Sequence, residues 1–169
     1  EKIINFKGIK QGIENTNYLL KSRRYKFILT IFEKRVSKKE IPFFMKLMDQ
    51  LNNFKINCPK PLKSKSKNYL IRIKNKTACI VSFLDGKDKK KLSLKNCFDI
   101  GKIVAQMHLS SKKMKLYRKN AMGIKKLNPL LNSIKFKSKK FINIEKFLKN
   151  NFRDIKKKWP KGLPNGIIH

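Results

Sequence analysis

A chain of 169 residues, 40% of them hydrophobic, is long enough to bury a core and too apolar to be a disordered tail. No run of 18 apolar residues occurs, so no membrane-spanning helix is expected. Cys58, Cys79 and Cys97 lack the pairing of a disulfide framework or zinc site. They predict reduced thiols, packed as small hydrophobic side chains, in a cytoplasmic protein.

The formal net charge of +34 is compatible with nucleic-acid binding or with a biased amino-acid composition. The kinds of basic residue and their distribution favour biased composition. Lysine far outnumbers arginine, which makes most bidentate phosphate and base-edge contacts, and the lysines are spread along the chain rather than clustered. Asparagine, isoleucine and phenylalanine, also favoured by AT-rich codons, are abundant. We expect weak, salt-sensitive binding of polyanions but no specific nucleic-acid partner.

The N-terminal part predicts a three-stranded antiparallel meander. Residues 3–6, 17–21 and 25–33 are short apolar runs typical of strands. The glycine-containing segment KGIKQGIENTN lies between the first two, and the basic turn 22–24 lies between the last two.

A helix is predicted after this meander, with Ser37 as its N-cap, Glu40 completing a capping box and Pro42 in the first turns. Two more strands are predicted at residues 68–73 and 77–84. One face of the helix carries the apolar residues Phe43, Phe44, Leu47, Met48 and Leu51.

The composition changes near residue 85, where the charged segment DGKDKKK begins. Ser93 is placed as the N-cap of an amphipathic helix that reaches Leu109, and a second such helix is predicted over 141–156. We therefore expect a sheet-and-helix lobe at residues 1–84 and a linker with a helical region at 85–169. The alternative is a single α+β domain with one charged loop.

Two segments have the composition of a nucleotide site. The glycines of GIKQGIENTNY allow a backbone to approach phosphates, although the segment is neither a Walker A loop nor a dinucleotide fingerprint, and an ordinary hairpin is the alternative. The strand in ACIVSFLDG leads into the charged linker, so it predicts either a hinge that binds a base edge through backbone groups or a simple core strand.

The sequence lacks the common catalytic signatures. His108 lies among apolar helix positions, which favours a packed structural role. There is no HExxH motif, and no acid is placed to form a triad with the neighbouring serines.

Five segments together resemble homoserine kinases of the aminoglycoside phosphotransferase and choline kinase superfamily: residues 5–35, 77–86, 100–108, 117–123 and 159–169. The resemblance implies an α+β, protein-kinase-like two-lobe fold. Residues 1–84 would be the nucleotide-binding lobe with an antiparallel sheet, and 85–169 the first helices of an incomplete C-terminal lobe. It also implies ATP-dependent phosphorylation of the L-homoserine hydroxyl in threonine biosynthesis, with Mg²⁺ on the phosphates.

The resemblance also assigns roles to individual residues. The hinge segment would bind adenine mainly through backbone groups, and two residues of the 117–123 segment would lie on the substrate side. The residues that would lie near the ATP phosphates are Gly8, Gly12, Asn15 and Asn17. The hinge residues are Ser82, Phe83 and Leu84, and the substrate-side residues are Arg118 and Asn120.

The last residues match the approach to a catalytic loop. His169 corresponds to the family's histidine that supports this loop. In that family an aspartate follows two positions later, then an asparagine, and further on a second aspartate that holds magnesium. We therefore expect a fragment that ends before its catalytic aspartates and is inactive alone.

One position departs from kinase-like folds, which usually carry a phosphate-binding lysine in the third strand, paired with a helix glutamate. Here Thr30 occupies the strand position, and the helix position lies near Phe44. Lys34 or Arg35 is a candidate replacement for the lysine, and Glu40 for the acid.

Two other functions stay open. A related kinase could act on another small alcohol, such as choline or an aminoglycoside. The second is a basic nucleic-acid-binding module without enzyme activity, whose binding affinity would fall steeply with salt concentration. The sequence predicts a small-molecule substrate and leaves the oligomeric state open.

Overall fold

The computed structural model describes residues 2–10, 14–33, 37–120, 123–134, 142–163 and 166–167. The chain forms two compact units. One consists of Glu1–Tyr117 with Gly166–His169, and the other of Arg118–Asn165.

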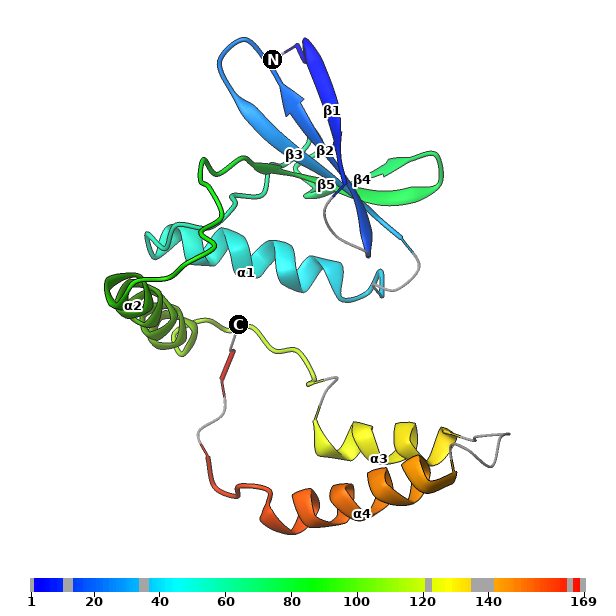
Figure 1. Cartoon of the computed structure of the whole chain (residues 1–169). Helices are drawn as coiled ribbons and strands as arrows, with labels where there is room; N and C mark the ends of the chain where they lie inside the picture. The colour runs from blue at the N-terminus through cyan, green and yellow to red at the C-terminus, as the bar shows by residue number, and fades with distance from the viewer. Residues whose placement is uncertain are drawn as a thin grey trace. The chain divides into compact units, whose positions relative to one another are not determined.

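The first unit contains a five-stranded antiparallel sheet, in the order β1-β2-β3-β5-β4 (Figure 1). Short connections join neighbouring strands β1, β2 and β3, while the helix α1 precedes β4 and β5. The strands are β1 (Asn5–Ile9), β2 (Asn15–Lys21), β3 (Lys26–Phe32), β4 (Leu70–Ile73) and β5 (Lys76–Ser82).

Two tight turns fix the register of this sheet. Ser22, which is buried, accepts a hydrogen bond at Oγ from the Tyr25 N–H at 2.9 Å and closes the basic turn between β2 and β3. Lys74 and Asn75 join β4 to β5 and both have positive φ, as a two-residue type I′ hairpin requires. Positive φ also occurs at Lys55 and Lys67.

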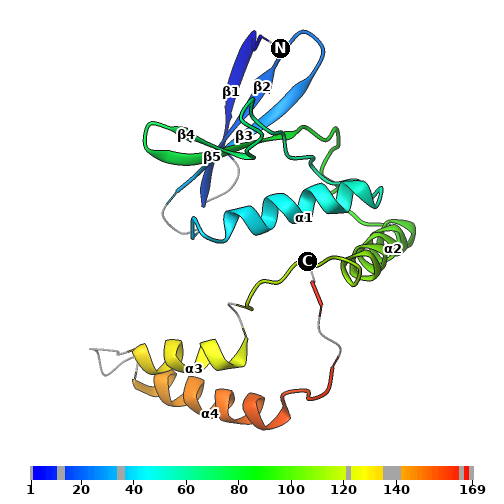
Figure 2. The same cartoon turned by 180° about the vertical axis from the view of Figure 1, so that it is seen from behind.

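The helix α1 (Ile41–Asn53) packs against one face of the sheet and lies below it in both views (Figures 1 and 2). Ile41 and Met45 of the helix form a buried cluster with Cys79 and Val81 of β5. Since successive strand residues point to opposite faces, the alternate residues of β3 and β5 meet the helix. Ile28, Phe32, Phe44, Met48, Tyr69 and Leu70 pack around this cluster.

The helix α1 begins later than the sequence predicts. Its N-cap is Glu40, and no side chain caps it, so the predicted capping box at Ser37 is wrong. The Ser37 carbonyl instead accepts a backbone hydrogen bond from Glu40 in a turn before the helix. Pro42 lies within the first turn, where its missing N–H costs no helical hydrogen bond.

The helix α2 (Leu94–Ser111) begins where the sequence predicts. Ser93 Oγ accepts a hydrogen bond from the Asn96 N–H, and the Asn96 side chain accepts one from the Ser93 N–H, which completes a capping box. A second core cluster joins the segment after α2 to the end of α1. Its buried residues are Leu51, Ile56 and Met114.

The second unit contains two helices side by side, α3 (Ile124–Ser133) and α4 (Ile142–Lys158) (Figure 1). The sequence predicts α4 but not α3. Pro129 lies inside α3, and a proline normally counts against a helix because it removes one backbone hydrogen bond. None of the described helices is both long and apolar enough to cross a membrane.

Most predicted strands agree with the structure within two residues. The first strand differs more, because β1 covers residues 5–9 instead of 3–6 and so includes Gly8. The predicted boundary between lobes at residue 84 stays a prediction.

The helix α2 exposes an apolar surface, with Leu94 91% and Phe98 71% exposed. We expect the chain of residues 1–169, expressed alone, to bind the dye ANS, to melt without a sharp transition and to show no kinase turnover. The double variant L94K/F98K should bind less ANS. A sharp cooperative melt with phosphotransfer from this chain would contradict this expectation.

The three cysteines are free, and their burial predicts the order in which they react. Burial raises the pKa of Cys79 to about 11 and also raises the pKa of half-buried Cys58, whereas Cys97 is exposed. The thiolate is the nucleophile, so maleimide at pH 7.5 should modify Cys97 first, Cys58 more slowly, and Cys79 only on unfolding. Peptide mapping of the labelled full-length protein checks this order, and early labelling of Cys79 would refute it.

Candidate functional site

The segment predicted to approach phosphates begins inside a strand. Gly8 lies in β1 directly opposite Tyr18, and an added Cβ would meet that ring at an ordinary 3.8 Å. A larger side chain would therefore fit at position 8 without a steric clash at its Cβ. Gly12 lies outside the described residues. Asn15 and Asn17 belong to β2 rather than to the loop before it.

Both asparagines lie on the face of the sheet that packs on α1. Asn17 pairs in register with Thr30, which in turn pairs with the core residue Cys79. The Thr30 hydroxyl donates a hydrogen bond to Asn17 Oδ1 at 2.8 Å. The buried Oδ1 of Asn15 has no hydrogen-bond partner among the described residues, so it is an acceptor that a ligand can satisfy.

The usual lysine–glutamate pair has no counterpart at the two aligned positions. Thr30 stands on β3, and Phe44 of α1 packs against the apolar core cluster. The candidate replacements Lys34 and Arg35 lie outside the described residues. Glu40 is the N-cap of α1, and its role as the acid stays a prediction.

The predicted hinge lies where β5 ends. Two hydrogen bonds of 2.9 Å join Ser82 to Lys60. The Ser82 N–H donates to the Lys60 carbonyl, and the Lys60 N–H donates to Ser82 Oγ. The Phe83 N–H donates to the Lys26 carbonyl at 3.2 Å. Within the described part of the chain, the Leu84 N–H donates to no other group. Leu84 is thus the hinge residue whose backbone donor stays available to a base.

An open pocket of about 400 Å³ lies at this end of the sheet. Lys26 Nζ lies 4.8 Å from the centre of the Phe83 ring and forms an ion pair with Asp85 at its edge. The pocket therefore combines an apolar ring with several cations. Its lining residues are Leu19, Lys21, Ser22, Arg23, Arg24, Tyr25, Lys26, Phe83, Asp85 and Gly86.

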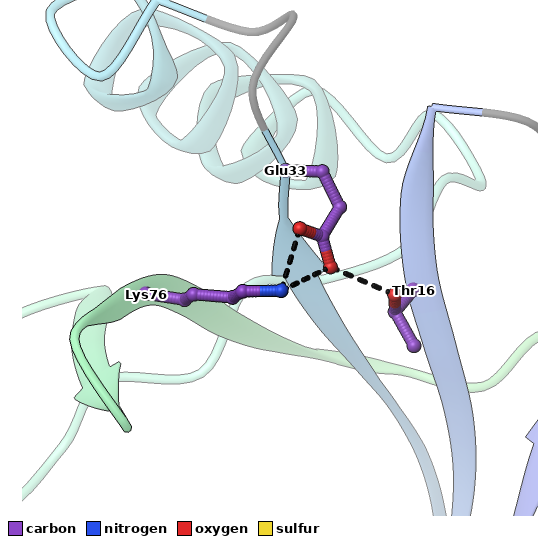
Figure 3. Close-up of polar contacts among 3 residues, drawn as sticks. All are labelled: Thr16, Glu33 and Lys76. Atoms are coloured by element: carbon purple, nitrogen blue, oxygen red, sulfur yellow. Dashed lines mark hydrogen bonds and ion pairs between the residues drawn. The ribbon is translucent and has the colours of Figure 1, made fainter.

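A three-residue polar cluster joins β2, β5 and the residue directly after β3 at the other end of the sheet (Figure 3). Lys76 Nζ contacts both Glu33 carboxylate oxygens, at 2.7 and 2.9 Å, and Thr16 Oγ1 donates to the same carboxylate at 2.9 Å. By strand alternation this cluster lies on the face away from α1. The sequence does not reveal it, because Glu33 and Lys76 are 43 residues apart.

The predicted substrate-side residues belong to the second unit. Asn120, but not Arg118, lines a pocket of about 560 Å³ there. His169 lies outside the described residues. The residues that line this pocket are Lys119, Asn120, Gly123, Ile124, Lys125, Lys126, Pro129 and Trp159.

No group of three or more histidine, cysteine, aspartate or glutamate side chains that could hold a metal occurs among the described residues.

Residues 5–169 match the sequence profile of the phosphotransferase enzyme family. The chain belongs to this family. It is 33% identical over 168 residues to the homoserine kinase of Parvibaculum lavamentivorans and 35% identical over 171 residues to that of Agrobacterium fabrum. Each comparison covers 99% of this chain and 52% of the relative, so the chain spans about half the length of these curated relatives.

Solved structures confirm the predicted aminoglycoside-phosphotransferase-like fold. Spectinomycin phosphotransferase, solved with ADP and spectinomycin, matches 92% of this chain and 50% of its own with a TM-score of 0.52 and 12% identity. A microcompartment-associated aminopropanol kinase matches 75% of this chain and 43% of its own with a TM-score of 0.60 and 13% identity.

The polar cluster predicts the acid titration of Glu33. Hydrogen bonds from Lys76 and then Thr16 lower the pKa of this carboxyl below its usual value of about 4.3. The cluster therefore adds stability above the unfolded-state pKa and loses it as the pH falls through the lowered folded-state value. A carbon-13 NMR titration should show the low pKa in the wild type, a clear rise in K76M and a smaller rise in T16V. An unchanged Glu33 pKa in K76M would refute this assignment.

Proposed function

We propose that the full-length protein is an ATP-dependent kinase that phosphorylates the hydroxyl of L-homoserine, as a step of threonine biosynthesis. The observation that carries this proposal is the similarity of 99% of the chain, at 33 to 35% identity, to proteins named homoserine kinase. The odd cysteine count supports a cytoplasmic location as part of the same proposal.

In this proposal the first unit binds ATP along the face of the sheet that packs on α1. The free N–H of Leu84 and the carbonyls of the hinge bind the adenine edge, and the neighbouring pocket at Phe83 holds part of the base or ribose. Asn15, Asn17 and the glycine loop lie at the phosphate end. The seven residues of β2 separate these ends by roughly 20 Å at about 3.3 Å per residue, enough for an extended nucleotide.

The phosphoryl transfer itself depends on positioning and on charge. Mg²⁺ bound to the phosphates would neutralise part of their charge. By the family resemblance, an aspartate two positions after His169 would orient or deprotonate the homoserine hydroxyl for in-line attack on the γ-phosphorus. Arg118 and Asn120 are proposed to lie on the substrate side.

The competing functions have less support. The spectinomycin and aminopropanol enzymes share the fold at 12 to 13% identity, which carries no information on the substrate of this chain. A nucleic-acid-binding module accounts for the charge of +34 but leaves the match to the phosphotransferase family unexplained.

The coding DNA beyond the codon for His169 gives a direct first test. We expect an aspartate two positions later, then an asparagine and a second aspartate downstream. A stop codon directly after His169 would rule out this kinase mechanism for the protein.

The substrate is then tested with the full-length protein by coupled ATP consumption on homoserine, choline and spectinomycin. We expect kcat/KM for homoserine to exceed that for the other two by at least about 100-fold, equivalent to roughly 2.7 kcal/mol. A higher value with choline or spectinomycin would replace homoserine as the substrate while leaving the kinase assignment in place.

A further inference from the structure

We propose that Thr30 is a positioning residue: its hydroxyl fixes the side-chain amide of Asn17 so that N–H donors, rather than the carbonyl oxygen, face the nucleotide phosphates. This inference rests on the proposed function, because it assigns Asn17 to the phosphate end of an ATP site. It replaces the cationic contact from β3 with a neutral one.

The first step is the orientation of the amide. An asparagine side chain has an acceptor oxygen at one end and two N–H donors at the other, and a threonine hydroxyl has one hydrogen to donate. That hydrogen is donated to Asn17 Oδ1 at 2.8 Å. The Asn17 Nδ2 group donates to no other group in the described part of the chain, so both N–H bonds stay available to a ligand oxygen.

The second step is the place of this pair in the fold. Both side chains lie on the face of the sheet that packs on α1, between the glycine-containing loop and the hinge. Both are half-buried, which strengthens a hydrogen bond relative to one in water. A phosphate oxygen at this place would meet amide donors held by the neighbouring strand.

The third step is why a lysine at position 30 does not suit this chain. The part of α1 that packs on the sheet is apolar, with Ile41, Phe44, Met45 and Met48 in the core cluster. A lysine at position 30 would place its charge half-buried among these apolar side chains, which is unfavourable. A hydroxyl–amide pair supplies donors to phosphate without that penalty.

A purely structural role is the competing explanation, because a threonine–asparagine pair also links two strands. The same sheet offers a matched comparison. Thr16, next to Asn17 in β2, donates a hydrogen bond of 2.9 Å to Glu33 on the opposite face. If hydrogen bonds between strands matter only for stability, loss of either threonine hydroxyl should have similar effects.

The test compares T30V, T30S and T16V in the full-length protein, by the KM for ATP, kcat, the Kd for ADP and the melting temperature. We expect T30V to raise the KM for ATP and the Kd for ADP about tenfold. T30S, which keeps the hydroxyl, should stay within about threefold of the wild type, and T16V within about twofold. N17D, which presents only acceptors to the phosphates, should raise the ADP Kd further than T30V does.

The inference is overturned if T30V leaves both ATP KM and ADP Kd unchanged, or if T16V changes them as much as T30V. If T30V fails to fold, the ADP Kd of N17D and of T30S is measured instead. An unchanged ADP Kd in N17D also overturns the inference. Failure of the substrate assignment is distinguishable, because a wild-type protein that binds ADP but does not phosphorylate homoserine refutes only the homoserine proposal.

Discussion

The packing of α1 against alternate residues of β3 and β5 determines which side chains of the sheet can act on a ligand. Ile41 and Met45 meet Cys79 and Val81, and this contact fixes one face of the sheet toward the helix. Every residue in register with this set then has a defined side. Asn17 and Thr30 lie on the helix side, while Thr16 and Glu33 lie on the other. The polar cluster at Thr16 and the pair at Asn17 therefore lie on opposite faces of the sheet.

Much of the fold could be predicted from local sequence, because strands, turns and caps depend on neighbouring residues. The apolar runs predict four of the five strands closely, and Ser93 predicts the start of α2. Ser37 has an equally good capping pattern but lies in a turn, since packing of Ile41 on the sheet determines where α1 begins. The sequence does not predict α3, a short helix that contains Pro129.

The candidate site was predictable only in part. Sequence segments predict residues near a nucleotide, and this stays a prediction, but they do not predict which of their groups stay available. The ladder of backbone bonds uses the donors of Ser82 and Phe83 and leaves that of Leu84. The pairing of Glu33 with Lys76 depends on a strand order that local patterns do not specify.

Four non-glycine residues in the described part of the chain have positive φ. Three of these four residues are lysines, at positions 55, 67 and 74, and the fourth is Asn75. Glycine adopts this conformation without a steric penalty, whereas a lysine there is disfavoured by about 1 kcal/mol. A lysine in this conformation therefore lowers the stability of its turn relative to glycine.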